Sequence, residues 1–304
     1  MRLPEEFVRT VVAACDGEPG RVWLARLPAL LAEVAAGWAL SVGEPYELSF
    51  TYVTRVTRAD GTPAVLKLCP PAYDEVRTEP AALRLAGGEG MVRLLDADPA
   101  RGALLLERAE PRETLVRLHG TDDEAATRVA AEVGLRLHRP VPDAARPTFP
   151  TVEGWAARAF ATLRERYAGG TGPLPAGVVE RGEREHAELV ASSAPAVLLH
   201  GDLHHGNVLS SARGWLAIDP KGVLGEPAYE VGALLRNPVG LGHRPDLRAV
   251  LDRRVPVLAE AYGVDRERVR GWGRAHNVVS LLWSHEDDDV VDTATLAVIE
   301  ALSG

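Results

Sequence analysis

The most informative stretch of this chain is Leu199-His200-Gly201-Asp202-Leu203-His204-His205-Gly206-Asn207-Val208, at residues 199–208 of 304. Apolar residues stand on both sides of it, which predicts short buried strands at 197–199 and 208–209 with a loop between them. A third apolar run, 215–218, ends at Asp219. An aspartate, an asparagine five residues on and a second aspartate are therefore all supported by short strands.

This spacing is typical of a site that transfers a phosphoryl group. Asp202 is the candidate base, because the acceptor hydroxyl must pass its proton to a nearby group. Asn207 and Asp219 are candidate Mg²⁺ ligands, since this ion prefers oxygen. Gly201 and Gly206 allow the tight turn that the loop needs. Single aspartates and asparagines more often build turns, but the combination with flanking strands favours the catalytic interpretation.

The histidines of the loop raise a zinc site as an alternative. His200 and His204 have the spacing that shares one helix face, and His205 follows directly. Glycines 201 and 206 argue against a helix there, and no glutamate lies between the histidines as the helical metalloprotease motif requires. We therefore reject zinc.

Residues 200–209 and 214–222 resemble the aminoglycoside phosphotransferase family, in particular its streptomycin 6-phosphotransferase and hydroxyurea phosphotransferase branch. The resemblance runs from about residue 45 to the C-terminus. It implies an α+β, bilobal, protein-kinase-like fold that binds ATP between a small N-terminal lobe with an antiparallel sheet and a larger, mainly helical C-terminal lobe. We expect residues 1–108 to form the nucleotide-binding lobe and residues 109–304 the catalytic and substrate-binding lobe.

A β-hairpin is predicted in the first lobe. Residues 46–56 are β-prone, residues 59–61 (Ala-Asp-Gly) form a turn, and residues 63–68 form the returning strand. Lys67, the lone lysine of that strand, fits the lysine that kinases place on the α- and β-phosphates. A solvated lysine at a sheet edge is the alternative.

The predicted partner of Lys67 lies in the next helix. Glu79 begins a helical segment with Pro80 in its first turn, where the missing N–H does little harm. Glu75 is a second candidate that spacing leaves open, and the family resemblance favours Glu79. The hairpin has no glycine-rich loop, so phosphate contact there must use hydroxyls such as that of Ser49, or sparse amides.

A strand at residues 103–109 is the predicted link between the lobes. Backbone groups of Glu107 and Ala109 are candidates to bind adenine, while core packing is an equal alternative for the side chains of this strand. Helical periodicity predicts helices at 5–16, 23–37, 123–138, 151–167, 178–191 and 231–235.

The residues after Asp219 indicate which kind of acceptor molecule the site binds. Only a few residues separate Lys221 from the next helix, which leaves no room for the long segment on which protein kinases dock a protein, so a small-molecule hydroxyl is the better acceptor. Lys221 either touches the transferred phosphate or pairs with a carboxylate. The further candidates for acceptor contact are Glu230 and, in a region resembling the tryptophan-acid segment of the streptomycin-kinase branch, Trp283, Glu286 and Asp287. An acidic run is more often a solvated face.

Composition narrows the function classes. Acidic side chains outnumber basic ones 43 to 34, which disfavours nucleic-acid binding and mildly favours cationic ligands. Only Cys15 and Cys69 are present, too few for a disulfide framework. No signal peptide or long apolar run is recognised, so we expect a cytoplasmic protein that does not bind membranes, as a monomer or weak dimer.

Three hypotheses follow. The first is an ATP- and Mg²⁺-dependent kinase of a small hydroxylated antibiotic that gives resistance by inactivation, with the cationic aminoglycoside streptomycin as leading acceptor and hydroxyurea second. The second is a metabolic sugar or amino-alcohol kinase of the same fold. The third is a silent nucleotide-binding module, which intact Lys67, Asp202, Asn207 and Asp219 disfavour.

Overall fold

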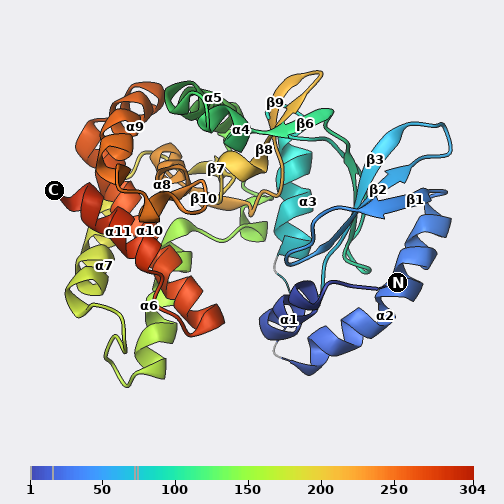
Figure 1. Ribbon diagram of the computed structural model, residues 1–304, viewed down its shortest axis with the longest axis horizontal. Helices are drawn as coiled ribbons and strands as arrows, with labels where there is room; N and C mark the ends of the chain where they lie inside the picture. Colours follow the sequence, from blue (N-terminus) through green and yellow to red (C-terminus); the bar gives the residue numbers. More distant parts are fainter. Residues whose placement is uncertain (1, 16, 72, 74) are drawn as a thin grey trace. The chain divides into compact units, whose positions relative to one another are not determined.

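The computed structural model describes residues 2–15, 17–71, 73 and 75–304, apart from the side chains of Asp287 and Asp288. The chain divides into two compact units, residues 1–109 and 110–304. Figure 1 shows strands β1 to β3 in the first unit and a predominantly helical second unit. The predicted α+β class, with an antiparallel N-terminal sheet and a mainly helical remainder, is confirmed.

Within the described part of the first unit, five strands form one antiparallel sheet in the order β1-β2-β3-β5-β4. The strands are β1 (Ser41–Pro45), β2 (Tyr52–Thr57), β3 (Pro63–Leu68), β4 (Leu94–Asp98) and β5 (Ala103–Glu107). The predicted hairpin turn joins β2 to β3: Gly61 has φ +82° and its N–H donates to the Arg58 carbonyl at 2.9 Å. This geometry favours glycine, and it fixes β3 as a central strand.

Helices α1 (Glu5–Ala14) and α2 (Glu18–Gly37) supply the other half of the core of this unit. Phe7 and Leu27 from these helices are fully buried with Leu66 and Leu68 of β3. Since side chains alternate along a strand, Lys67 points to the opposite face of the sheet. Burying each such leucine stabilises the fold by roughly 1.5–3 kcal/mol. The packing of these leucines therefore fixes the position of β3, and with it the backbone of Lys67.

Two predicted boundaries in this unit are wrong. Residues 46–51 connect β1 to β2 instead of starting a strand, because Pro45 lacks an N–H for the ladder and the pairing register shifts there. Helix α3 (Glu75–Ala86) begins before Glu79, so Pro80 lies inside the helix and not in its first turn. An acidic residue in the first turn, Glu75, favours the earlier start.

The second unit is built around the long helix α10 (Arg266–Asp288), which packs against helices α6, α7, α8, α9 and α11. The other helices are α4 (Leu115–His119), α5 (Asp123–Leu137), α6 (Val152–Arg166), α7 (Ala176–Ala191), α8 (Val231–Arg236), α9 (Leu247–Tyr262) and α11 (Thr293–Ser303). Two small sheets complete it: β6 (Pro111–Thr114), β8 (Val208–Ser211) and β9 (Gly214–Ala217) form one, and β7 (Val197–Leu199) pairs with β10 (Val223–Gly225) in the other.

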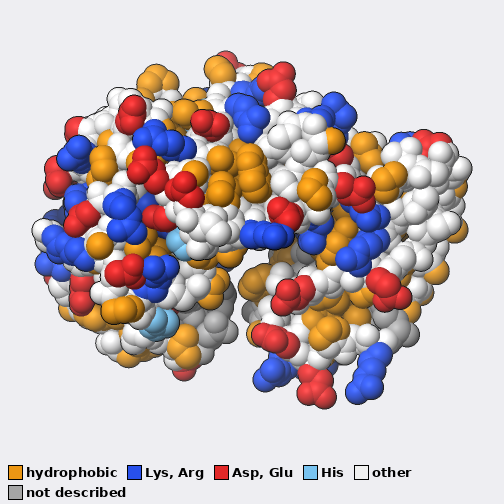
Figure 2. Space-filling model, turned by 45° about the horizontal axis from the view of Figure 1, so that its top comes forward, with side chains coloured by type: hydrophobic (Ala, Val, Ile, Leu, Met, Phe, Trp, Pro, Cys, Tyr) orange, Lys and Arg blue, Asp and Glu red, His pale blue; other side chains and the backbone are white. Residues whose placement is uncertain are grey.

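Among the described residues, no helix is both long and apolar enough to span a lipid bilayer. On the face in view in Figure 2, acidic and basic side chains are interspersed over each unit. This face therefore offers no broad basic surface of the kind that binds nucleic acid.

Candidate active site

The loop after β7 carries Asp202 and Asn207, and the β8–β9 hairpin carries the chain from Asn207 to Asp219. Val208 pairs with Ala217, and the Ile218 N–H donates to the Asn207 carbonyl at 2.9 Å, which extends the ladder by one step. Asn207 and Asp219 therefore flank the same end of this hairpin. The strands expected on each side of the loop are present.

A hydrogen bond inside the loop orients the Asn207 amide. Its Nδ2 donates to the Asp202 carbonyl at 3.0 Å, so the amide nitrogen is committed to the backbone. The Oδ1 atom is then the Asn207 group that fits a cation. A carboxylate from Asp219 completes an oxygen donor set of the kind that Mg²⁺ prefers.

His200 ties the loop to the residue before Asp219. The Asp202 N–H donates to His200 Nδ1 at 3.2 Å, and His200 Nε2 lies 2.7 Å from the Ile218 carbonyl. An accepting Nδ1 requires the proton on Nε2, which donates to Ile218. Burial lowers the pKa of His200 to about 4, so the ring is neutral at pH 7. Sequence reasoning considered this histidine only as a metal ligand and missed its structural role.

Backbone conformation sets Asp219 apart from its neighbours. Its φ is +58°, in the left-handed region that residues other than glycine rarely adopt. Such strained residues cluster at functional sites, where surrounding bonds hold them. One of those bonds comes from Lys221, whose backbone N–H donates to the His200 carbonyl at 2.8 Å.

Glu230 lies beneath the loop. Its side chain is buried, and Oε1 accepts the Gly201 N–H at 3.1 Å. Burial is the main cause that raises the pKa of Glu230 to about 7. An acceptor molecule has no access to a carboxylate in this position, so Glu230 supports the loop, contrary to the expectation that it lines the acceptor pocket.

Two tryptophans lie beside the loop. Trp283, an expected acceptor contact, meets Trp155 of α6 edge to face, with 5.4 Å between ring centroids. Trp155 in turn touches Gly201: a Cβ added there would lie 2.9 Å from the Trp155 ring, and φ at Gly201 is +85°. Both the backbone and the aromatic contact therefore require glycine at this position. Sequence reasoning gave no signal for Trp155.

The two acidic residues expected to contact the acceptor, Glu286 and Asp287, lie in the last turn of α10. Glu286 is exposed and borders a shallow depression with Arg166 and other residues of α6. The side chain of Asp287 lies outside the described residues.

The first unit contains the predicted ion pair. Lys67 Nζ lies 2.9 and 2.7 Å from the two carboxylate oxygens of Glu79, and both side chains are buried. The structure thus pairs Lys67 with Glu79, the partner that the resemblance favoured over Glu75. A buried pair with two short contacts holds the ammonium group in one place on β3.

The remaining nucleotide candidates also lie in the first unit. Ser49 is exposed in the connection between β1 and β2, and Ala109 is buried just beyond β5. The Glu107 N–H donates to the Arg93 carbonyl at 2.8 Å, so this N–H is already used inside the sheet. Other backbone groups of Glu107 and those of Ala109 stay the predicted contacts for adenine.

One cluster of potential metal ligands occurs among the described residues, behind the loop. Single ligand atoms of His119, Asp123 and His205 lie within 4.8 Å of one another. Arg254 already fills the role of a cation there, since its guanidinium lies 2.7 Å from Asp123 Oδ1 and 3.1 Å from His119 Nδ1. We interpret this cluster as an ion-pair network, and it includes neither His200 nor His204.

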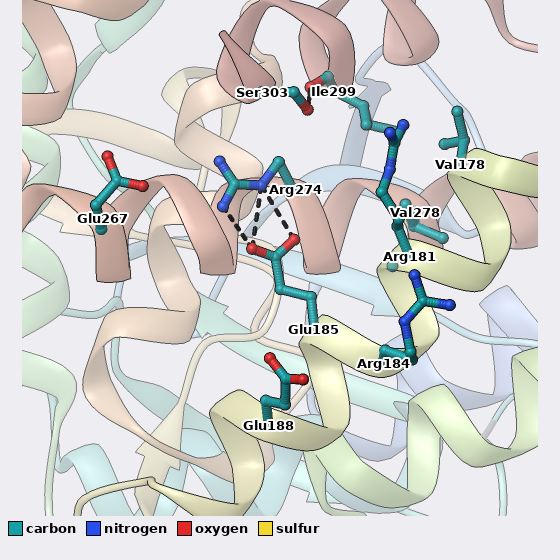
Figure 3. A pocket seen from close by; sticks show the side chains of 11 residues that line it. Val178, Arg181, Arg184, Glu185, Glu188, Glu267, Arg274, Val278, Ile299 and Ser303 are labelled. Atoms are coloured by element: carbon teal, nitrogen blue, oxygen red, sulfur yellow. Dashed lines mark hydrogen bonds and ion pairs between the residues drawn. The ribbon is translucent and has the colours of Figure 1, made fainter.

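A hollow of about 410 Å³ lies between α7, α10 and α11. Figure 3 shows the side chains that line it. The Glu185–Arg274 ion pair, with its shortest contact at 2.5 Å, crosses it, and Arg181 and Arg184 border it. None of the residues predicted for catalysis lines this hollow.

The fold and the loop are those that the sequence predicts for a phosphotransferase, and comparison with known proteins identifies the family. Residues 38–288 match the family model described as "Aminoglycoside/hydroxyurea antibiotic resistance kinase", and the chain belongs to this family. It is 35% identical to a streptomycin 6-kinase from Streptomyces glaucescens, over 100% of this chain and 98% of that one. It is also 35% identical to a hydroxyurea phosphotransferase from Kitasatospora aureofaciens, over 100% and 86%.

A solved structure supports the fold. The chain is similar to a thermostable mutant of an aminoglycoside phosphotransferase that was crystallised with ADP and hygromycin B. The TM-score is 0.61 at 14% sequence identity, and the match covers 90% of this chain and 97% of the other. The chain is therefore a phosphotransferase of the aminoglycoside and hydroxyurea kinase family.

Proposed function

We propose that this protein transfers the γ-phosphoryl group of ATP to a hydroxyl of streptomycin. The observation that carries the proposal is the segment from His200 to Asp219, in which hydrogen bonds link Asp202 to the His200 ring and to the Asn207 amide, and the β8–β9 hairpin joins Asn207 to Asp219. Relatives named streptomycin 6-kinase at 35% identity support the choice of acceptor. Phosphorylation would inactivate the antibiotic, and the cytoplasm is the compartment we expect.

Asp202 acts as the base in this proposal. The acceptor O–H bond breaks and its proton passes to a carboxylate oxygen of Asp202. The freed oxygen forms a bond to the γ-phosphorus as the bond from that phosphorus to the β–γ bridging oxygen breaks, which releases ADP. His200 contributes by holding the Asp202 backbone through the 3.2 Å bond from its N–H.

Five side chains and the backbone of two further residues are the proposed contributors to nucleotide binding. Asn207 Oδ1 and the Asp219 carboxylate would hold Mg²⁺, which neutralises phosphate charge when bound. Lys67, oriented by Glu79 at 2.7 Å, binds the α- and β-phosphates. The Ser49 hydroxyl contacts phosphate, and the backbone at Glu107 and Ala109 binds adenine.

The proposed acceptor contacts are Trp283, Glu286, Asp287 and Lys221. Streptomycin carries guanidinium groups, which carboxylates bind through paired hydrogen bonds and aromatic faces through cation–π attraction. Trp283 contacts Trp155 edge to face, and Trp155 contacts Gly201, the residue before Asp202. These contacts support an acceptor site with aromatic side chains near Asp202. Hydroxyurea is the second candidate, because a hydroxyurea phosphotransferase is equally similar, and a sugar or amino-alcohol kinase is the third.

Initial-rate measurements test this proposal. Purified protein with Mg²⁺ and ATP is offered streptomycin, hydroxyurea, glucosamine or choline, and ADP release is measured together with the mass of the product. We expect a gain of one phosphoryl group on streptomycin, and Asp202→Asn serves as the inactive control. Phosphorylation of hydroxyurea with no reaction on streptomycin would reverse the ranking, and ADP release independent of every acceptor would contradict it altogether.

A further inference from the structure

The carboxylate of Asp202 has a nitrogen donor opposite each of its oxygens. His204 Nε2 lies 3.7 Å from Oδ2, and Arg236 Nη2 lies 3.7 Å from Oδ1. We propose that His204 and Arg236 are positioning residues that hold the Asp202 carboxylate, from both sides, in the orientation that accepts the proton of the acceptor hydroxyl. This inference rests on the proposed function of Asp202 as base.

The tautomer of His204 is fixed by a backbone hydrogen bond. The Gly206 N–H donates to His204 Nδ1 at 3.0 Å, so Nδ1 bears no proton and the neutral ring carries it on Nε2. Nε2 is the atom that faces Asp202. Burial is the main cause that lowers the pKa of His204, which keeps the ring neutral. The Nε2–H group opposite Oδ2 therefore carries a bond dipole and not a full charge.

Gly206 is part of the same arrangement. A Cβ at this position would lie 2.9 Å from His204 Cε1 and 3.1 Å from Nδ1. Contacts this short would displace the imidazole ring of His204 from its hydrogen bond with the N–H of residue 206. A glycine at 206 thus allows the ring to accept the N–H of residue 206 and to face Asp202 at the same time.

Arg236 approaches from a different element. It is the last residue of α8, and its Nη1 donates to the hydroxyl of Ser280, a buried residue of α10. This bond holds the guanidinium from behind while Nη2 faces Asp202. Two side chains from separate parts of the sequence therefore converge on one carboxylate, which is not expected by chance at a turn.

The distances separate this arrangement from a structural ion pair. Elsewhere in the second unit, Arg254–Asp123, Arg268–Glu226 and Arg274–Glu185 are in direct contact at 2.5–2.7 Å. At 3.7 Å the two donors orient Asp202 electrostatically without a direct hydrogen bond. The lone pairs of its oxygens stay open to an acceptor hydroxyl, as a base requires.

The first test compares kcat with KM. Arg236→Ala and His204→Ala should each lower kcat for streptomycin phosphorylation by about 10- to 100-fold, the cost of a misplaced catalytic group, with KM for ATP within about threefold of the parent. Arg236→Lys, which restores charge, and His204→Gln, which restores a donor, should recover part of kcat. His243→Ala and Arg248→Ala, at exposed positions of the same unit, are the controls, and melting curves verify folding.

A double-mutant cycle gives the decisive comparison. In an Asp202→Asn background, adding Arg236→Ala should change the residual rate by less than about twofold, because the carboxylate it positions is gone. A loss as large as in the parent background would overturn this proposal and leave the proposed function standing. Full activity of Asp202→Asn alone would instead remove the base assignment, and this proposal with it.

Discussion

Asp202 is the side chain whose loss should cost the most catalysis, because we propose that its carboxylate takes the acceptor proton. Asp202→Asn should lower kcat by about 10²- to 10⁴-fold, the usual contribution of a general base. The Kd for ATP should stay within about threefold, since the proposed role of this carboxylate is at the acceptor and not at the nucleotide. Acceptor-dependent ADP release and calorimetry measure the two quantities, and activity within tenfold of the parent would contradict the assignment.

Asp219 should act on the metal and not on the proton. Asp219→Ala removes a carboxylate ligand, so we expect loss of activity and weaker Mg²⁺-dependent ATP binding, with Asn207→Ala acting in the same direction. Calorimetric titration of ATP with and without Mg²⁺ is the measurement. If the Asp219→Ala protein keeps the full Mg²⁺ dependence of the parent, the ion is held elsewhere.

Glu286 and Asp287 decide between a cationic and a neutral acceptor. For streptomycin, the double change Glu286→Gln with Asp287→Asn should raise KM for the acceptor more than KM for ATP, because the guanidinium groups lose their counter-charge. Added salt should raise the same KM in the parent. Initial rates at two ionic strengths measure both effects, and unchanged KM values for streptomycin would remove these residues from the acceptor site.

At the scale of helices, one arginine joins four elements behind the catalytic loop. Arg254 of α9 is buried, contacts Asp123 of α5 and His119 of α4, and donates to the Leu234 carbonyl at 2.7 Å at the end of α8. The ring of His119 packs at 5.2 Å from that of His205 within the loop. The network therefore connects the helical scaffold to the segment that carries Asp202.

Removing this arginine should destabilise the second unit strongly. Arg254→Ala leaves the partly buried Asp123 carboxylate with His119, at 2.8 Å, as its remaining partner, and we expect a loss of about 3 kcal/mol in the free energy of unfolding. Denaturant titration measures it, and Arg253→Ala, at the exposed neighbouring position, is the matched control. A difference below about 1 kcal/mol between the two variants would show that α5 and α9 do not depend on the pair.

Elements with a local signal could be predicted from the sequence. Strands β3, β8 and β9 follow from apolar runs next to turn residues, and Lys67 was located by its place in such a run. Contacts between distant segments could not be predicted. Arg236 reaches Asp202, and Trp155 reaches Gly201, only because helices α8 and α6 pack beside the loop.

The wrong predictions for residues 46–51 and for Glu230 have the same cause, which is that tertiary contacts are not visible in the local sequence. Residues 46–51 have β-prone side chains, yet tertiary pairing begins at Tyr52. Glu230 has the charge of an acceptor contact, but folding buries it under the Gly201 N–H. Residue type alone does not distinguish an exposed carboxylate from a buried one.

At the scale of the whole molecule, the histidines are distributed unevenly. All 9 lie beyond residue 109, in the second unit. His186, His200 and His276 are buried, and burial lowers the pKa of each: to about 4 for His186 and His200, and well below its ordinary value for His276. In the unfolded chain these rings take up a proton near their ordinary pKa of about 6.5.

Acid should therefore unfold the second unit first. Stability from the neutral buried rings is present above about pH 6.5 and is lost as pH falls toward 4, since the unfolded state binds more protons. Glu230 acts in the opposite direction, because its raised pKa of about 7 makes stability fall as pH rises to that value. It is one group, whereas the pKa is lowered for seven histidines of the same unit. Hydrogen exchange at pH 7 and pH 5 should show protection lost in residues 110–304 before 1–109.

Two variants check the sign of this prediction. His186→Gln has no proton to gain, so the pH dependence of unfolding should become shallower, whereas the exposed His243→Gln should leave it unchanged. Equal loss of protection in both units, or none in the second, would contradict the prediction.

The edge contact between Trp155 and Trp283 has a spectroscopic consequence. Indole emission changes with the polarity and packing around the ring, and Trp155 touches the α-carbon side of Gly201, one residue from Asp202. Of the 6 tryptophans, Trp155 is the one with this contact to Gly201, so a difference spectrum against Trp155→Phe isolates its signal. Any shift of the loop when an acceptor binds alters the surroundings of Trp155. The emission of Trp155 should therefore report acceptor binding without an added dye.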